Sequence, residues 1–226
     1  MNLVFVGCEY SGKSTLATEV MKWAVEALGG TSHFHDHFSI PSSELTANAQ
    51  ESAKNVHPQF LEMFQRFSLT YHLKPSFYAE EDHNLMGFVI EEAVYAPLYY
   101  GYGGPDSQSP QRSPEGQRTE MARFFEEKML IAAPDTVLVL FKATPDIIRQ
   151  RMKQAPHTHQ IVRHHDVELV LRRFEEEFEA SLIQKRVTLD TSTATVKETL
   201  AEFVEAYQPF YSNADLLRLK QRSVSR

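Results

Sequence analysis

The feature that most constrains this chain lies near its start, where an apolar run leads directly into a glycine-rich loop. Leu3 to Val6 are all apolar, which is typical of a parallel strand buried on both faces. The residues that follow satisfy the pattern G-x-x-x-x-G-K-[ST], and a helical pattern begins directly after them. A strand, this loop and a helix in that order predict a site for the phosphates of a nucleotide.

Each residue type in the loop has a physical reason. Glycines let the backbone turn tightly, so that loop N–H groups and the N-terminus of the helix point at anionic oxygens. Lys13 adds a positive charge near the β and γ phosphates, and Ser14 is expected to ligate Mg²⁺. A chance glycine-rich turn is the alternative explanation. We therefore expect ATP and Mg²⁺ as cofactors, and the residues expected to bind ATP are Gly7, Ser11, Gly12, Lys13, Ser14 and Thr15.

Further along the chain, apolar runs of strand length alternate with helical patterns, which predicts a parallel sheet. The expected strands after the first are 33–38, 86–90, 137–141 and 187–189. The expected helices are 16–28, one with a buried stripe formed by Phe60, Phe64, Phe67 and Tyr71, 118–132, one starting at Thr144, one running to about Leu182, and 195–207. Residues 41–57 are a polar excursion with no clear assignment, within which 44–54 could form a short solvated helix. The fold class is therefore α/β, a three-layer P-loop NTPase fold with a parallel sheet between helices and a small lid.

The domain organisation is expected to be simple. With 226 residues, of which 42% are hydrophobic, the chain can bury one sizeable core, and we expect a single domain over residues 1–207. Residues 101–117 are rich in Gly, Pro, Ser and Gln and predict a mobile surface loop. The polar span of about 150–166, with four histidines, is expected to be the lid, and residues 208–226 a basic C-terminal tail.

Composition narrows the class of partner. A formal net charge of −7 argues against a protein that binds nucleic acid through a basic face. The single cysteine, Cys8, excludes an internal disulfide framework and fits a reducing, cytoplasmic location. No stretch approaches the length of a membrane span. We expect a small-molecule acceptor as the partner, with no nucleic acid and no membrane, and we leave a homodimer open.

The loop alone does not choose the reaction, because kinases, GTPases and ATPase motors share it. A GTPase would carry D-x-x-G and N-K-x-D strings, and neither occurs in the sequence. A motor would need an apolar strand that ends in paired acids, for which the only candidate is 89–92, Val-Ile-Glu-Glu. These patterns favour a phosphotransferase.

The order of elements over roughly residues 1–207 resembles the thymidylate kinase and deoxynucleoside kinase group of P-loop kinases. The loop itself, Gly7-Cys8-Glu9-Tyr10-Ser11-Gly12-Lys13-Ser14, looks like the thymidylate kinase form, which carries an acid where Glu9 stands. The resemblance implies that Glu9 approaches the acceptor sugar. The alternative is a tolerated residue at a position that the general motif leaves free.

Three consecutive residues on the helix after the polar excursion resemble the acceptor site of the same group. Phe64 and Gln65 are similar to a pair in which a stacking ring precedes an amide that reads the base, and a glutamine offers both donor and acceptor. Arg66 resembles the arginine that thymidylate kinases place against the acceptor phosphate. With Glu9, these residues are the expected substrate-binding set. The alternative places Phe64 in the core and leaves Gln65 and Arg66 solvated.

The segment 88–99 looks like the part of these kinases that carries an acid followed by an arginine. Glu91 takes the acid position, at the carboxyl end of a central strand, where it could hold Mg²⁺ or accept a proton. The alternative is an exposed carboxylate at a strand end. The position of the arginine is occupied by Glu92, whose carboxylate would repel an acceptor phosphate. This departure leaves open a neutral acceptor, or a phosphate held by Arg66, and also the question of whether transfer is retained.

The resemblance implies further charged groups around the reaction. Asp36 would accept the hydroxyl proton or hold Mg²⁺-bound water, and the alternative is an ordinary acid at a strand end. Lid arginines among Arg149, Arg151 and Arg163 would offset developing charge. Arg151 and Arg163 are the preferred pair, although surface arginines are common on helices. The catalytic residues expected from the sequence are therefore Lys13, Asp36, Glu91, Arg151 and Arg163.

The histidines on the second strand suggest a metal site as another possibility. His33, His35 and His37 share one face of that strand, and three imidazoles could bind zinc. Neighbouring histidines on one strand splay apart, however, and zinc has no part in this kind of transfer. The sequence thus predicts an ATP-dependent kinase acting on a nucleoside monophosphate or nucleoside. The alternatives are a nucleotide-binding switch without transfer and a kinase for another small-molecule alcohol.

Overall fold

The computed structural model describes residues 1–29, 32–36, 45–79, 82–103 and 118–224. Five parallel strands form one sheet in the order β2-β3-β1-β4-β5. The strands are β1 Leu3–Gly7, β2 Ser32–Asp36, β3 Asp82–Met86, β4 Val137–Lys142 and β5 Lys185–Asp190. The parallel sheet predicted from the sequence is therefore confirmed.

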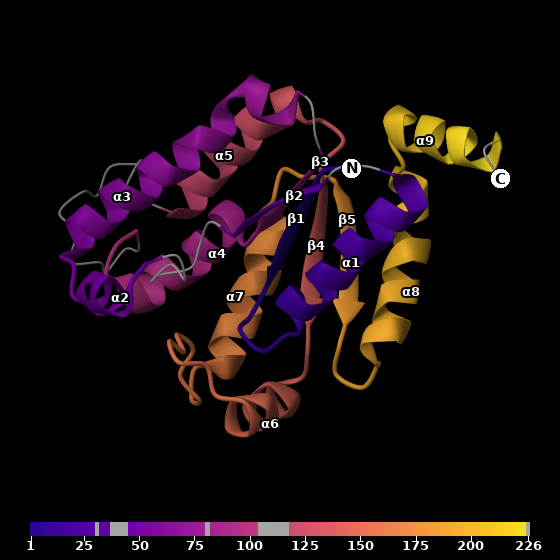
Figure 1. Cartoon of the computed structure of the whole chain (residues 1–226). Helices are drawn as coiled ribbons and strands as arrows, with labels where there is room; N and C mark the ends of the chain where they lie inside the picture. Colours follow the sequence, from indigo (N-terminus) through magenta and orange to yellow (C-terminus); the bar gives the residue numbers. More distant parts are fainter. Residues whose placement is uncertain (30–31, 37–44, 80–81, 104–117, 225–226) are drawn as a thin grey trace.

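Helices cover both faces of the sheet, as Figure 1 shows. Alternate residues of β1 point to opposite faces, so Leu3 and Phe5 pack with α1 and α8, whereas Val4 and Val6 pack with α4, α5 and α7. The layers are thus helix, sheet and helix. The helices are α1 Lys13–Leu28, α2 Ala47–Lys54, α3 Pro58–Thr70, α4 Phe88–Tyr95, α5 Arg118–Ala132, α6 Pro145–Gln154, α7 Val167–Ala180, α8 Val196–Tyr207 and α9 Asn213–Val224.

Several element boundaries follow from local chemistry and confirm the sequence predictions. Helix α1 ends at Gly29, which adopts the left-handed conformation with φ of 72° that favours glycine at this position. Helix α8 begins after Thr195, whose hydroxyl accepts from the N–H of Glu198 while the Glu198 carboxylate accepts from the N–H of Thr195. Helix α5 spans the predicted residues 118–132.

The third strand lies earlier than predicted. Strand β3 is the polar sequence Asp82–Met86, and the apolar run that we expected to be the strand, 86–90, instead starts helix α4. Every residue of α4 is buried, so it lacks the polar face that normally reveals a helix, and a short apolar run is then ambiguous between strand and helix. Asp82 is tolerated in β3 because it pairs with the amino group of Met1 at 2.6 Å and with Arg218 at 2.6 Å.

The predicted buried stripe of helix α3 is also wrong. Phe60, Phe64, Phe67 and Tyr71 are between 53% and 81% exposed, and the buried face is formed by Leu61, Glu62, Gln65 and Leu69. Of the two polar side chains on the inner face, Glu62 pairs with the buried Arg118 at 2.7 Å, whereas Gln65 Oε1 has no partner among the described residues. The apolar pattern alone therefore predicted the outer, exposed face of this helix as the buried one.

The expected C-terminal tail contains a helix that packs on the domain. Helix α9 contacts α1, and Asp215 in its first turn is fully buried. The Asp215 carboxylate lies 3.4 Å from the amino group of Met1 and accepts from Tyr207 Oη at 3.2 Å. Residues 208–224 thus belong to the folded body. The predicted mobile loop at 101–117 lies, from residue 104 onward, outside the described residues.

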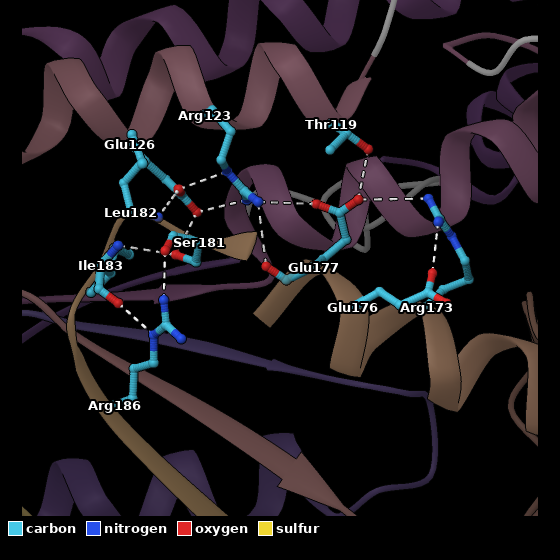
Figure 2. Close-up of polar contacts among 10 residues, drawn as sticks. All are labelled: Thr119, Arg123, Glu126, Arg173, Glu176, Glu177, Ser181, Leu182, Ile183 and Arg186. Atoms are coloured by element: carbon cyan, nitrogen blue, oxygen red, sulfur yellow. Dashed lines mark hydrogen bonds and ion pairs between the residues drawn. The ribbon is translucent and has the colours of Figure 1, made fainter. Parts of the chain in front are cut away.

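A buried polar network joins α5 to α7 on one side of the sheet (Figure 2). The Glu126 carboxylate, fully buried, accepts from Arg123 Nη2 at 2.9 Å, Ser181 Oγ at 2.8 Å and the N–H of Leu182 at 2.8 Å. Glu177 accepts from Thr119 Oγ1 at 2.6 Å in the same network. Because a buried carboxylate is tolerated only with such partners, these contacts fix the end of α7 and the turn into β5.

Candidate functional site

A cavity of about 600 Å³ opens at the carboxyl ends of the central strands, where ligands bind in open α/β sheets. The phosphate loop forms its floor, α4 contributes Glu91 and Tyr95, and the residues after α6 and β5 form its remaining walls. The lining includes Cys8, Glu9, Tyr10, Gly12, Lys13, Ser14, Thr15, Met86, Glu91, Tyr95, Arg151, Ala155, His157, His159, Ile161 and Thr191.

Both motif glycines are required by the geometry of the loop. A Cβ at Gly7 would lie 2.6 Å from the carbonyl oxygen of Phe141 on the neighbouring strand. Gly12 caps α1 with a φ of 83°, a left-handed conformation that side-chain-bearing residues rarely adopt. Helix α1 then starts at Lys13. Because the first N–H groups of a helix have no intrahelical partner, the loop presents them at the cavity floor.

Lys13 and Glu91 form an ion pair at the cavity. The Lys13 ammonium contacts the Glu91 carboxylate, and Glu91 is 5% exposed. Glu91 lies in the first turn of α4 rather than at the end of a strand, because the third strand ends at Met86. A Cβ at Gly87 would lie 2.5 Å from the Glu91 carboxylate, so the glycine allows this carboxylate to fold back towards the loop. Two of the predicted catalytic residues are thus brought together.

The two predicted lid arginines are placed differently. Arg151, on α6, donates from Nη1 to the carbonyl of Tyr10 at 2.8 Å and from Nη2 to the carbonyl of Thr191 at 2.6 Å. It therefore lies at the cavity wall. Arg163 is exposed, stands 5.7 Å from the ring centroid of Tyr99 and is not part of the cavity lining. The structure therefore groups Arg151, but not Arg163, with the phosphate loop.

Glu9 contacts the polypeptide after α6. Its Oε2 accepts from the N–H groups of Ile161 at 2.9 Å and Val162 at 2.8 Å. Its own N–H donates to Tyr95 Oη at 3.0 Å. The Glu9 carboxylate is thus engaged with residues of the predicted lid, and this contact was not foreseen from the sequence.

The three consecutive residues predicted for the acceptor do not form one surface. Gln65 is 3% exposed, whereas the neighbouring Phe64 is 64% exposed on the outer face of α3. Adjacent residues of a helix do not face each other, so a ring at position 64 cannot lie beside the amide at 65. Arg66 is half-exposed, and its Nε lies 3.2 Å from the Glu62 carboxylate. None of the three lines the described cavity.

Glu92 faces a buried arginine rather than the cavity. It is 1% exposed, accepts from Tyr102 Oη at 3.0 Å and lies 3.3 Å from Arg118 Nη2. Burial raises the pKa of Glu92 to about 7, against the opposing attraction of Arg118. Arg118 Nη2 also donates to Glu62 at 2.7 Å. The expected repulsion of an acceptor phosphate is therefore moderated, because the charge of Glu92 has its own partner.

Asp36 ends β2 beside Met86, which lines the cavity, so the backbone at position 36 reaches the same edge of the sheet. The position of its side chain lies outside the described residues, as does all of His37. His33 and His35 share a face of β2, and the ring of His35 lies 5.6 Å from that of His83 on β3. Within the described ranges, no group of three or more His, Cys, Asp or Glu side chains is arranged to hold a metal ion.

Sequence reasoning missed Tyr10 and Thr191 as site residues. Thr191 follows β5, donates from Oγ1 to the carbonyl of Ser11 at 2.6 Å and accepts from Arg151. The rule that ligands bind beyond the carboxyl ends of parallel strands would have pointed to this position. Tyr10 occupies a free position of the motif, so the pattern itself carried no signal for it.

A scan of protein-family models and a search of curated proteins found no match to this sequence. Solved structures do match. YorR from Bacillus subtilis, in complex with phosphorylated GDP, is 14% identical, with 94% of this chain and 100% of that chain covered and a TM-score of 0.54. Deoxyadenosine kinase from M. mycoides, with the products dCMP and dCDP, is 12% identical, with coverage of 92% and 100% and a TM-score of 0.55.

Thymidylate kinase from Candida albicans is 9% identical, with 92% of this chain and 91% of that chain covered and a TM-score of 0.52. The chain has the fold of the P-loop nucleotide and nucleoside kinases. At these identities the likeness describes the fold, which agrees with the resemblance drawn from the sequence. In the described part of the chain, no helix has both the length and the apolarity needed to cross a membrane.

Proposed function

We propose that the protein is an ATP- and Mg²⁺-dependent kinase that transfers the γ-phosphoryl group to a nucleoside monophosphate or a nucleoside. The observation that carries the proposal is the cavity in which Lys13, Glu91 and Arg151 surround a phosphate loop with both motif glycines in their required conformations. The kinase fold of the structural neighbours supports the same reaction class.

The roles follow from the positions of the charges. Lys13 and the N–H groups at the start of α1 bind the β and γ phosphates, and Arg151 supplies a second cation at the wall. Ser14, exposed in the first turn of α1, and Glu91 across the cavity would hold Mg²⁺. Mg²⁺, when bound, offsets the charge of the phosphate oxygens. Asp36 or Glu91 would accept the proton of the acceptor hydroxyl.

The acceptor would enter from the side of α3 and α4. Gln65 supports this direction, because its Oε1 is buried with no hydrogen-bond partner among the described residues, and such an atom is costly unless a ligand satisfies it. Arg66 remains the proposed contact for a phosphate-bearing acceptor. A neutral nucleoside has no phosphate, so of these two residues only Gln65 would contact it. Arg163 does not line the cavity and would reach the transferred phosphoryl group only after movement of the lid.

The test is steady-state phosphorylation of a panel of nucleosides and nucleoside monophosphates with ATP and Mg²⁺. We expect at least one acceptor to be phosphorylated and Lys13→Ala to lose both turnover and ATP binding. Lys22→Ala is the matched control, since Lys22 is an exposed lysine on the same helix. Absence of transfer to every acceptor, together with unchanged ATP binding by Lys13→Ala, would refute the proposal.

Two alternatives give different results in the same assay. A nucleotide-dependent switch binds ATP but shows no turnover stimulated by any acceptor, and Glu92 in place of an arginine is the observation that favours it. A kinase for another small alcohol fails on the nucleoside panel but phosphorylates polyols or amino alcohols. The motif and the cavity are common to all three possibilities, so the acceptor panel decides among them.

We also propose that the enzyme is a cytoplasmic homodimer joined through the outer face of α3. An exposed apolar stripe runs along that helix and consists of Phe60, Met63, Phe64, Phe67 and Tyr71. Taking ~200 Å² for each large side chain, their exposed parts come to roughly 600 Å², at the upper limit for a monomer surface. Two copies would bury about 1,200 Å², enough for a stable interface. The single cysteine, buried in the loop, agrees with a reducing location.

Phe67→Glu tests the dimer, because Phe67 is the most exposed member of the stripe at 81%. We expect light scattering coupled to size-exclusion chromatography to give the mass of a dimer for the parent and of a monomer for the variant. Val25→Glu, which adds the same charge at a 48% exposed apolar site on α1, should remain dimeric. A parent that is monomeric at all concentrations would contradict the proposal.

A further inference from the structure

The segment between α6 and α7 forms part of the cavity wall and has no regular secondary structure. Residues 155–162, here named the cover segment, include Ala155, His157, His159 and Ile161 in the cavity lining. A segment that lacks its own backbone ladder must be held by other contacts. Those contacts come largely from two consecutive residues of the phosphate loop.

The first is Glu9, whose side chain is 15% exposed. One carboxylate oxygen accepts from two backbone N–H groups of the cover segment, those of Ile161 and Val162. The other oxygen lies 3.4 Å from Nδ1 of His157. Hydrogen bonds to an ionised acceptor are stronger than neutral ones, and donors from the backbone need no particular side chain at positions 161 and 162.

The second is Tyr10, which has a φ of 65°, a value that non-glycine residues rarely adopt. Such a conformation persists only where the surroundings fix it. Its ring stacks on His157 with centroids 4.1 Å apart, and its hydroxyl accepts from the N–H of His157 at 2.8 Å and donates to Gln160 Oε1 at 2.9 Å. Arg151 donates to its carbonyl.

From these contacts we infer that Glu9 and Tyr10 form a latch that holds the cover segment over the phosphate loop and thereby limits the rate at which nucleotide leaves. They are positioning residues for the lid. This inference rests on the proposed function for the identity of the nucleotide, but the contacts themselves do not depend on catalysis. It gives Glu9 a role different from the expected contact with the acceptor sugar.

The latch also explains why two of the four free positions of the motif, 9 and 10, carry large side chains in this chain. Between Gly7 and Gly12 the phosphates need only backbone N–H groups, so side chains at positions 9 and 10 can face outwards. Here both face the cover segment. Because the same loop binds the phosphates and carries the two latch residues, opening of the cover segment and release of the nucleotide are coupled.

The test compares Glu9→Ala, Glu9→Gln and Tyr10→Phe with the parent. In the protein without nucleotide, hydrogen exchange of the peptide containing Ile161 and Val162 should be roughly tenfold or more faster in Glu9→Ala, from the loss of bonds to an ionised acceptor. Glu9→Gln keeps an acceptor oxygen and should give a smaller increase. Tyr10→Phe removes the hydroxyl bonds but keeps the ring, so the increase should be largest at His157.

Stopped-flow release of a fluorescent ATP analogue is the second readout. Release should accelerate in Glu9→Ala, while the KM for the acceptor stays unchanged. Glu127→Gln, a change of acid to amide at an exposed site on α5, should match the parent in both measurements. Thermal unfolding verifies that each variant is folded. If Glu9→Ala does not fold, both measurements are made on Glu9→Gln instead.

Two outcomes would overturn the inference. Unchanged exchange at Ile161 and Val162 in both Glu9 variants would mean that the carboxylate does not hold the cover segment. A raised acceptor KM with unchanged nucleotide release would place Glu9 at the acceptor instead. If the protein bound no nucleotide, the proposed function would fail, and hydrogen exchange would still decide whether the latch exists.

Discussion

The buried pair of Glu92 and Arg118 predicts an unusual dependence of stability on pH. The folded pKa of Glu92 is about 7, above its usual 4.5. Between these values the unfolded chain has lost the proton that the folded protein keeps, so the free energy of unfolding falls as pH rises. A shift of one pKa unit corresponds to about 1.4 kcal/mol, so ionisation of Glu92 should lower the free energy of unfolding by about 3 kcal/mol. This loss should be complete above pH 7 and absent below pH 4.5.

Glu92→Gln removes this titration and keeps an oxygen that can accept from Tyr102 and Arg118. Urea unfolding of parent and variant between pH 4.5 and 8.5 measures the effect. We expect similar stabilities at the acid end and a difference in favour of the variant that grows to about 3 kcal/mol at the basic end. A difference that stays constant across this range would refute the reasoning. Arg118 keeps Glu62 as a partner in the variant, so its charge is not left buried alone.

Three further predictions follow from buried groups elsewhere in the chain. Gly7→Ala should cost about 1–3 kcal/mol of stability, because the new Cβ meets the Phe141 carbonyl, and should abolish the thermal shift caused by ATP in calorimetry. Burial and the neighbouring histidines lower the pKa of His83 to about 4, so stability should fall as pH drops from 6.5 towards 4. Relative to the parent, His83→Gln should lose this slope in urea unfolding. Glu126→Ala should destabilise by about 1–3 kcal/mol in the same assay, because it removes the acceptor for Ser181 Oγ and the N–H of Leu182, while Arg123 keeps Glu177 at 3.4 Å.

Most of the fold could be predicted because its signals are local. A glycine in the left-handed region ends α1, and a capping box starts α8; both are readable from a few neighbouring residues. Strand β3 could not be predicted in the same way. Its buried Asp82 depends on Arg218, which is 136 residues away in the sequence, and no local pattern reports such a partner. A polar strand buried by distant ion pairs looks like a loop.

In the candidate site, too, the residues that depend on local sequence could be predicted and those that depend on distant contacts could not. The positions of Lys13 and Ser14 follow from the motif, since the backbone of the loop sets them. The acceptor side of the site depends on which face of α3 packs against the domain. The outer face is more apolar than the inner one, so the apolar pattern predicted the wrong face as buried. Phe64 was therefore assigned with Gln65 although they point in different directions. The contact between Glu9 and Ile161 spans 152 residues and depends on the fold as a whole.

The two faces of α3 connect the proposed dimer to the proposed reaction. Gln65, on the inner face, has a buried oxygen without a partner among the described residues, while Phe67, two residues later, is the most exposed ring of the outer stripe. Helix α3 makes few contacts with the sheet and is held to the rest of the domain by Leu69 in the core and by the ion pair of Glu62 with Arg118. A second copy packed on the outer stripe would hold the helix, and with it Gln65, in place. Loss of the dimer should therefore raise the KM for the acceptor more than the KM for ATP, since the phosphate loop lies on the central strand and does not depend on α3.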